Sequence, residues 1–329
     1  MKNKFRNLFL AFGILAVIIM LFTFDVSYDE LLDNLRRAGF YLPLVLVLWL
    51  FIYLINTLSW YIILRSSGPV NSLSFARLYK FTVSGFALNY VTPVGLMGGE
   101  PYRIMELTPY VGVERATSSV ILYVMMHIFS HFCFWLSSVL IYVFFYPVGW
   151  GMGIVLGLIT LFCLLLVTLF IKGYRNGMAV ACMRLGSLIP FLQRHAVRFA
   201  ELHKEKLETI DSQIALLHQQ RKSTFYSALG LEYTARIVGC LEVWLILNVL
   251  TTDVSFVGCI LIVAFSSLLA NLLFFLPMQL GGREGGFALA VAGLSLSGAY
   301  GVFAALITRL REMVWIVIGL VLMKIGNRK

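Results

Sequence analysis

Five stretches of the chain are apolar over a length that can cross a bilayer. A transmembrane helix needs roughly 20 apolar residues to pass through about 30 Å of hydrocarbon. The five stretches are Phe40–Leu64, Thr117–Phe145, Gly151–Ile171, Ser223–Leu250 and Gly301–Met323. Hydrophobic patterning therefore predicts a membrane protein built from helices.

A sixth span is predicted at the N-terminus. Basic residues in Met1–Asn7 precede the apolar run Leu8–Phe24, a layout shared with signal peptides. No small-residue cleavage site follows, and Asp25–Arg37 has the pattern of an amphipathic connector. We expect an uncleaved first span and a cytoplasmic N-terminus.

Two further apolar segments, Phe75–Val91 and Val254–Leu276, are interrupted. Each runs into a proline, then a glycine pair and a glutamate. Proline cannot continue a helix, and glycine permits backbone conformations that other residues resist. Irregular backbone at membrane depth requires protein or a wet cavity around it. Each segment is therefore predicted to form one arm of a re-entrant helical hairpin.

The two interruptions form an internal repeat. Residues 89–103 read NYVTPVGLMGGEPYR, and residues 274–287 read FFLPMQLGGREGGF. In both copies a glutamate lies seven residues after the proline, and these glutamates, Glu100 and Glu284, are 184 residues apart. The repeat predicts two related halves within one membrane domain, a feature of many secondary transporters.

The predicted domain is a single unit, residues 1–329, with the first repeat at 39–145 and the second at 223–325. Between them, residues 172–222 carry nine Lys or Arg and four Asp or Glu, and are predicted to be a cytoplasmic amphipathic connector. Six spans and two hairpins place the basic clusters and both termini on the cytoplasmic face. The second repeat is then inverted relative to the first. Charge alone does not distinguish this arrangement from eight full spans.

Composition supports the membrane assignment and narrows the function. The chain is 60% hydrophobic and 13% charged, with a net charge of +10, against about 25% charged residues in soluble domains. The basic residues lie between apolar stretches and form no aromatic-interleaved stripe, so we expect no nucleic-acid partner. The five cysteines share no paired spacing, and we expect no metal site and no cofactor.

Charges inside a membrane domain are candidates for function. An anion such as a lipid phosphate is expected to bind at the hairpins, because arginine is a good bidentate partner for phosphate and a helix starting near Glu100 offers its positive end. The candidate binding residues are Asn89, Gly98, Gly99, Glu100, Arg103, Arg236, Gly281, Gly282, Arg283, Glu284 and Arg309.

Two other groups of polar residues have structural interpretations. Glu232 and Arg236 are four residues apart and are expected to pair on one helical face. His127 and His131 have the spacing of a helical metal pair but no third ligand, so a packed, hydrogen-bonded pair is expected. The hairpin charges have a structural alternative too, as ion pairs between helices.

The motifs resemble those of the flippase-like transmembrane domain of lysylphosphatidylglycerol synthases and their stand-alone relatives. The resemblance is carried by residues 89–103, by P-x-x-x-G-G-R-E-G from Pro277 to Gly285, and by Arg309. It implies a bacterial inner-membrane protein that translocates lipids, in some relatives an aminoacylated phosphatidylglycerol. The sequence ends at Lys329, so synthesis of that lipid is not expected.

Together these features predict a flippase-like transporter for an anionic or aminoacylated phospholipid or a polyprenyl-linked lipid, and not an enzyme. The expected location is the bacterial cytoplasmic membrane, and the expected partners are the lipid and, as an open alternative, a second copy in a homodimer. A membrane-embedded glycosyltransferase, another lipid-modifying enzyme and a scaffold for such an enzyme remain the competing interpretations.

Overall fold

The computed structural model describes residues 36, 39–70, 73–91, 98–176, 212, 222–251, 253–272 and 282–325. Within these ranges the regular secondary structure is helical, and the predicted all-α membrane fold is confirmed. The predicted first span, Leu8–Phe24, lies outside the described residues, as does most of the predicted connector at 172–222.

Five long helices match the five apolar stretches. They are α3 (Tyr41–Ser66), α6 (Val113–Phe145), α7 (Trp150–Asn176), α11 (Lys222–Leu247) and α14 (Gly298–Lys324). Helices α3, α6 and α7 each contain an uninterrupted apolar window long enough to cross a membrane. Helices α11 and α14 are as long but carry charged residues in their central turns. Helix α7 extends five residues past the expected end of its span, into the start of the predicted connector.

The two interrupted segments form pairs of shorter helices. The first pair is α4 (Phe75–Val91) and α5 (Gly99–Val111), and the second is α12 (Phe256–Leu272) and α13 (Gly282–Ala292). The arms contain 17, 13, 17 and 11 residues. At 1.5 Å per residue they are about 16–26 Å long, which is short for a full crossing. The described helical part of each arm is thus shorter than a membrane span.

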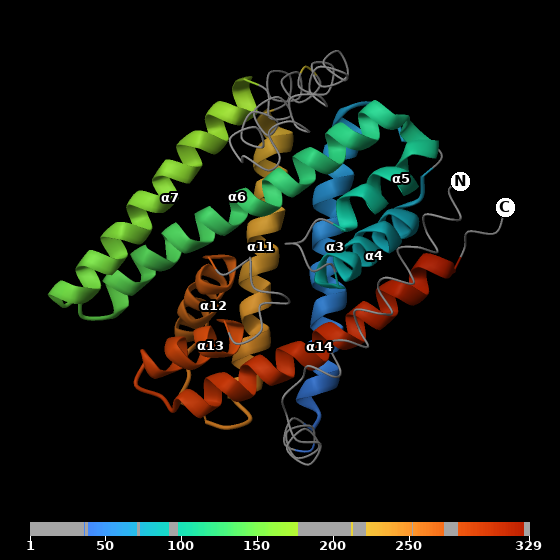
Figure 1. Cartoon of the computed structure of the whole chain (residues 1–329). Helices are drawn as coiled ribbons and strands as arrows, with labels where there is room; N and C mark the ends of the chain where they lie inside the picture. Colours follow the sequence, from blue (N-terminus) through green and yellow to red (C-terminus); the bar gives the residue numbers. More distant parts are fainter. Residues whose placement is uncertain are drawn as a thin grey trace, which may run out of the picture.

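Helices α3 and α11 run antiparallel through the centre of the molecule (Figure 1). Near one end, the Ser59 hydroxyl donates to the Ala228 carbonyl at 3.3 Å. Near the other, the Trp49 indole N–H donates to Glu242 at 2.8 Å. Because equivalent helices of the two halves have opposite directions here, the contact supports an inverted repeat.

Each hairpin packs against long helices of both halves. The α4–α5 pair contacts α6 of its own half through α5 and α14 of the other half through α4. Correspondingly, α12–α13 contacts α14 through α13 and α6 through α12. If each helix is replaced by its equivalent in the other half, the same set of contacts results. Helix α7, which packs on α6, has no equivalent among the described helices and is an addition to the repeat. The hairpins therefore interlock the two halves.

A glycine allows α14 to approach α4 closely. The Ser84 hydroxyl donates to the Gly319 carbonyl at 2.9 Å. A Cβ at position 319 would lie 2.5 Å from the Ala87 Cβ and 3.1 Å from the Val83 carbonyl oxygen. Small residues have this role at helix interfaces in membranes, where close packing replaces the hydrophobic effect.

Gly319→Ala is expected to destabilise the protein by about 1–3 kcal/mol, because the added methyl group overpacks the α4–α14 contact. Thermal unfolding of the purified protein in detergent measures the change. Gly239→Ala in α11 is the matched control, since a Cβ there meets no atom within 4 Å. Equal melting temperatures for the two variants would contradict the proposed close contact.

Candidate functional site

The first hairpin contains a buried ion pair. Helix α5 begins at Gly99, directly after the first break, and places Glu100 and Arg103 on one face because they are three residues apart. The Arg103 Nη1 lies 3.3 Å from Glu100 Oε1. The Arg103 side chain is 1% exposed and the Glu100 side chain is 24% exposed. The glutamate is therefore the accessible member of the pair.

Asn89 connects the two arms of this hairpin. Its amide Nδ2 donates to Glu100 Oε1 at 2.9 Å, and its Oδ1 accepts the Gly99 backbone N–H at 2.6 Å. A Cβ at Gly99 would lie 2.1 Å from the Gly85 carbonyl oxygen. The Gly98–Gly99 pair thus lets α5 begin directly against α4, with one of its first N–H groups already bonded.

Arg103 lies in a closely fitted pocket between α4 and α6. Its Nη2 donates to the Thr82 carbonyl at 3.3 Å, and its guanidinium carbon lies 4.7 Å from the Phe86 ring centroid and 5.4 Å from that of Tyr123. A Cβ at Gly85 would lie 2.3 Å from Arg103 Nε. Aromatic faces and a carbonyl oxygen stabilise the charge where little water can reach it.

The second hairpin has ion pairs of its own, made with α14. Arg309 Nε donates to Glu284 Oε1, and Arg283 Nη1 donates to Glu312 Oε1. The Glu284 side chain is 24% exposed, whereas that of Arg309 is 4% exposed. The glutamate of each hairpin is therefore partly exposed and bonded to a buried arginine.

A third ion pair joins α14 to the centre of the molecule. Arg311 Nε and Nη2 bind the two carboxylate oxygens of Glu242 at 2.9 and 3.0 Å. The Arg311 guanidinium carbon lies 3.7 Å from the Trp49 ring centroid, and Trp49 also donates to Glu242. This bidentate, stacked geometry links α3, α11 and α14.

Tyr90, next to Asn89 at the end of α4, brings the two hairpins into one region. Its hydroxyl lies close enough to Arg283 of the second hairpin, and to Arg311 and Glu312 of α14, to interact with their charges. Neighbouring residues of α4 therefore contact the first ion pair and lie near the second group of charges.

Arg236 belongs to a separate cluster, and the expected pair with Glu232 is wrong. Within the described residues Glu232 accepts a hydrogen bond from His127 at 2.8 Å. Arg236 donates to the Ser130 hydroxyl and the His127 carbonyl, each at 2.6 Å. Both side chains thus face α6 instead of each other. His127 and His131 do pack together, with ring centroids 5.6 Å apart.

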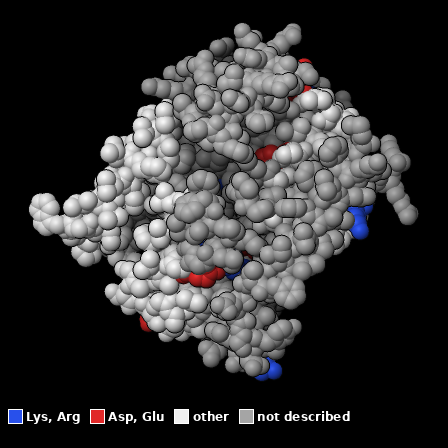
Figure 2. Space-filling view, in the orientation of Figure 1, with Lys and Arg blue, Asp and Glu red and all other residues white. Residues whose placement is uncertain are grey.

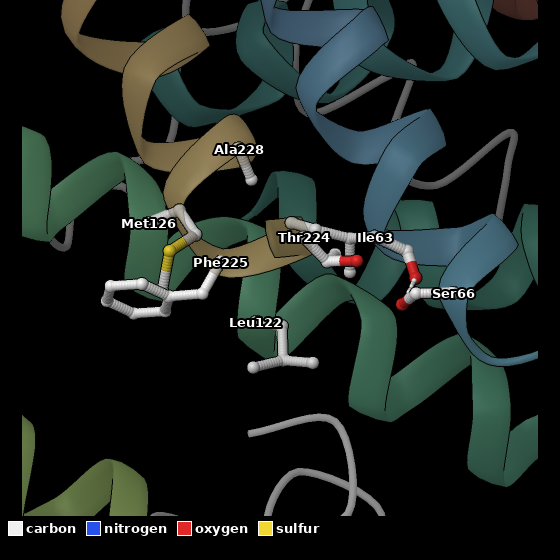
Figure 3. A pocket seen from close by; sticks show the side chains of 7 residues that line it. All are labelled: Ile63, Ser66, Leu122, Met126, Thr224, Phe225 and Ala228. Atoms are coloured by element: carbon white, nitrogen blue, oxygen red, sulfur yellow. Dashed lines mark hydrogen bonds between the residues drawn. The ribbon is translucent and has the colours of Figure 1, made fainter. Parts of the chain in front are cut away.

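In Figure 2, acidic atoms with basic atoms beside them are visible over the α13–α14 region. A separate pocket between α3, α6 and α11 is lined by apolar side chains and the hydroxyl-bearing Ser66 and Thr224 (Figure 3). The seven residues that line this pocket include no charged side chain.

Comparison with known proteins agrees with this architecture. A family model described as the lysylphosphatidylglycerol synthase TM region matches residues 8–320. The chain belongs to this family. It is thereby a multi-pass membrane protein, and the predicted family membership is confirmed.

A relative within the curated proteins is a UPF0104 membrane protein of Methanothermobacter thermautotrophicus. The two sequences are 24% identical over 291 residues, which is 86% of this chain and 82% of the relative. No solved structure matches the chain. The relative's length supports a family branch that consists of the membrane domain.

The predicted site residues divide into three groups in space: the first hairpin, the second hairpin, and Arg236, which bonds to α6. Asn89, Gly98, Gly99, Glu100 and Arg103 meet at the first hairpin, and Arg283, Glu284 and Arg309 meet at the second. Gly282 is the first residue of α13, and Gly281 lies outside the described residues. Sequence reasoning missed the partners Glu242 and Tyr123, although a glutamate inside an apolar span was a signal for the first.

Asn89→Ala is expected to destabilise the protein by about 1 kcal/mol, because the Gly99 N–H and Glu100 both lose a buried partner. Asn271→Ala is the matched control, since within the described residues it removes only a hydrogen bond to Ser267 in the preceding turn. Unfolding of both variants in detergent measures the difference. If Asn271→Ala were the more destabilised variant, Asn89 would not have the assigned role.

Proposed function

We propose that the protein moves an anionic lipid headgroup across the membrane, with Arg103 and Arg309 as its binding groups. The observation that carries this proposal is that the glutamate after each break pairs with an arginine, Glu100 with Arg103 inside α5 and Glu284 of α13 with Arg309 of α14. In each, a glutamate with a 24% exposed side chain bonds to an arginine that is almost fully buried. A structural bridge alone does not require this arrangement at both breaks.

The chemistry is an exchange of anions. In the unoccupied state the carboxylates of Glu100 and Glu284 neutralise Arg103 and Arg309, which avoids an unpaired charge in an apolar interior. A lipid phosphate can offer two oxygens to the guanidinium, whereas Glu100 contacts Arg103 through Oε1, and it replaces the carboxylate. The displaced glutamate is partly exposed, so it can turn toward water and later return to release the headgroup.

The inverted relation of the halves supplies a route to both leaflets. Inverted hairpins give the site equivalent entrances from opposite sides, and rearrangement of one half against the other alternates them. The interlocked contacts of α4 with α14 and of α12 with α6 make each hairpin responsive to both halves.

The family supports a lipid as the cargo, because its name refers to a synthase of an aminoacylated phospholipid. We propose an anionic or aminoacylated phospholipid, or a polyprenyl-linked lipid, as substrate, without a catalytic step. We also propose residence in a cytoplasmic membrane with cytoplasmic termini, from the basic connector and ends.

Glu100→Gln and Glu284→Gln are each expected to slow lipid movement about tenfold and to tighten headgroup binding about tenfold. Glutamine is a weaker competitor for arginine, since a hydrogen bond to a charged group contributes about 1.5–3 kcal/mol. Movement is measured with fluorescent phosphatidylglycerol in proteoliposomes without added donor. Binding of a short-chain phosphatidylglycerol is measured on the purified protein.

Glu114→Gln is the matched control, because this glutamate is exposed in the first turn of α6. It is expected to leave both measurements unchanged. Unaltered rates in the Glu100→Gln and Glu284→Gln double variant would refute anion exchange. A product that forms only when a glycosyl or aminoacyl donor is added would instead indicate an enzyme, and neither activity would leave a scaffold.

A further inference from the structure

A buried polar cluster between α6 and α11 is not used by the anion exchange described above. His127 Nδ1 lies 2.8 Å from Glu232 Oε2. The Glu232 side chain is 1% exposed and the His127 side chain is 31% exposed. A carboxylate this deep in an apolar protein is costly, and it lies next to a histidine that reaches the surface.

Several polar atoms of this cluster are buried and have no hydrogen-bond partner within the described residues. They are Glu232 Oε1, the Tyr123 hydroxyl and the His131 Nδ1, and the nearby Arg103 Nε is in the same condition. Buried polar atoms usually have a hydrogen-bond partner. The lack of partners for these four atoms among the described residues therefore points to a role other than packing.

The cluster is physically connected to the arginine of the first hairpin. Phe86 lies 4.7 Å from the Arg103 guanidinium and 5.6 Å from the His127 ring. Tyr123 lies 5.4 Å and 6.5 Å from the same two groups. Phe86 and Tyr123 therefore each lie close to both Arg103 and His127. An apolar medium screens charge weakly, so the charge at Arg103 acts on His127.

The charged and titratable groups around the His127–Glu232 pair can be named. They are Arg236 from α11, Arg103 from α5, and Tyr123 and His131 from α6 itself. Helix α3 contributes Trp60, stacked on Tyr123, and α12 contributes Ser267, bonded to Trp135, and both are uncharged. With His127 neutral, Glu232 and Arg236 sum to zero charge, as do Glu100 and Arg103.

We infer that His127 and Glu232 form a proton-binding site that takes up one proton when an anionic headgroup binds at Arg103. The headgroup adds one negative charge to this neutral region, because the Glu100 carboxylate that it displaces from Arg103 stays ionised at the first hairpin. A proton on the pair changes its charge from −1 to 0 and restores neutrality. Because unpaired charge is costly inside a membrane, the two binding events favour each other. The inference rests on the proposed function for headgroup binding at Arg103 and for the consequence that lipid movement is coupled to protons.

Proton uptake on binding is measured first, without transport. A short-chain phosphatidylglycerol is added to the purified full-length protein in weakly buffered detergent that contains a pH indicator dye. About one proton is expected to leave the solution per headgroup bound, and binding is expected to weaken up to tenfold per pH unit in the alkaline range, by linkage.

Glu232→Gln fixes the pair in its uncharged form. It is expected to remove proton uptake and to make binding independent of pH, while binding itself persists. His127→Gln is expected to reduce the proton uptake. This second variant tests the inference if Glu232→Gln does not fold. Glu114→Gln is the control and should behave as the unaltered protein. Binding without proton uptake in the unaltered protein, or full uptake in Glu232→Gln, would overturn the inference.

A pH gradient across proteoliposomes then tests the coupling. Fluorescent phosphatidylglycerol is expected to accumulate in the leaflet that faces the alkaline side, by up to tenfold for one pH unit, which is a tenfold ratio of protons. Glu232→Gln is expected to move the probe without bias. Movement without bias in the unaltered protein would overturn coupling but leave lipid transport intact. Proton uptake without any movement would refute transport and support the proton site.

Discussion

The structure depends on the pairing of charges inside an apolar protein. Arginines and glutamates in α5, α11, α13 and α14 would each be costly to leave alone at membrane depth. Several ion pairs among the described residues join two helices, as Arg311 with Glu242 does between α14 and α11, and Glu100 with Arg103 lies at the start of α5. These pairs set which helices meet, because a one-turn shift of either partner would leave a charge exposed to hydrocarbon.

The same constraint explains why function and fold are difficult to separate here. An ion pair that is fully buried on both sides, such as Arg311 with Glu242, has the geometry of a permanent link. The pairs at the hairpins differ, because one partner is partly exposed and follows a broken helix. Exchange with an external anion is easiest where the internal anion can leave, and this distinguishes the hairpin glutamates from the central one.

Close backbone approach is the second requirement. Membrane helices gain little from burying apolar surface against each other, so contact distance decides stability. Gly85 makes room for the Arg103 guanidinium, Gly99 lets α5 start against α4, and Gly319 brings α14 onto α4. The glycines of the repeat therefore do more than permit a turn, since they position the charged side chains.

The all-α membrane class, the bounds of the long helices to within a few residues, the two interrupted segments and the family can all be predicted from the sequence. These follow from local properties: apolar length, the backbone limits of proline and glycine, and a repeated motif. The Glu100–Arg103 pair was predictable because helical spacing alone brings its members together.

The partners that meet across helices, in contrast, depend on how the helices pack. Glu232 and Arg236 have the spacing of a pair, yet each bonds to α6 because His127 and Ser130 offer nearer contacts in the packed protein. Glu242 meets Arg311, and Tyr90 lies near the second hairpin, across separations in sequence that no periodicity encodes. Spacing along one helix determines which residues share a face, whereas the packing of the two halves determines what that face meets.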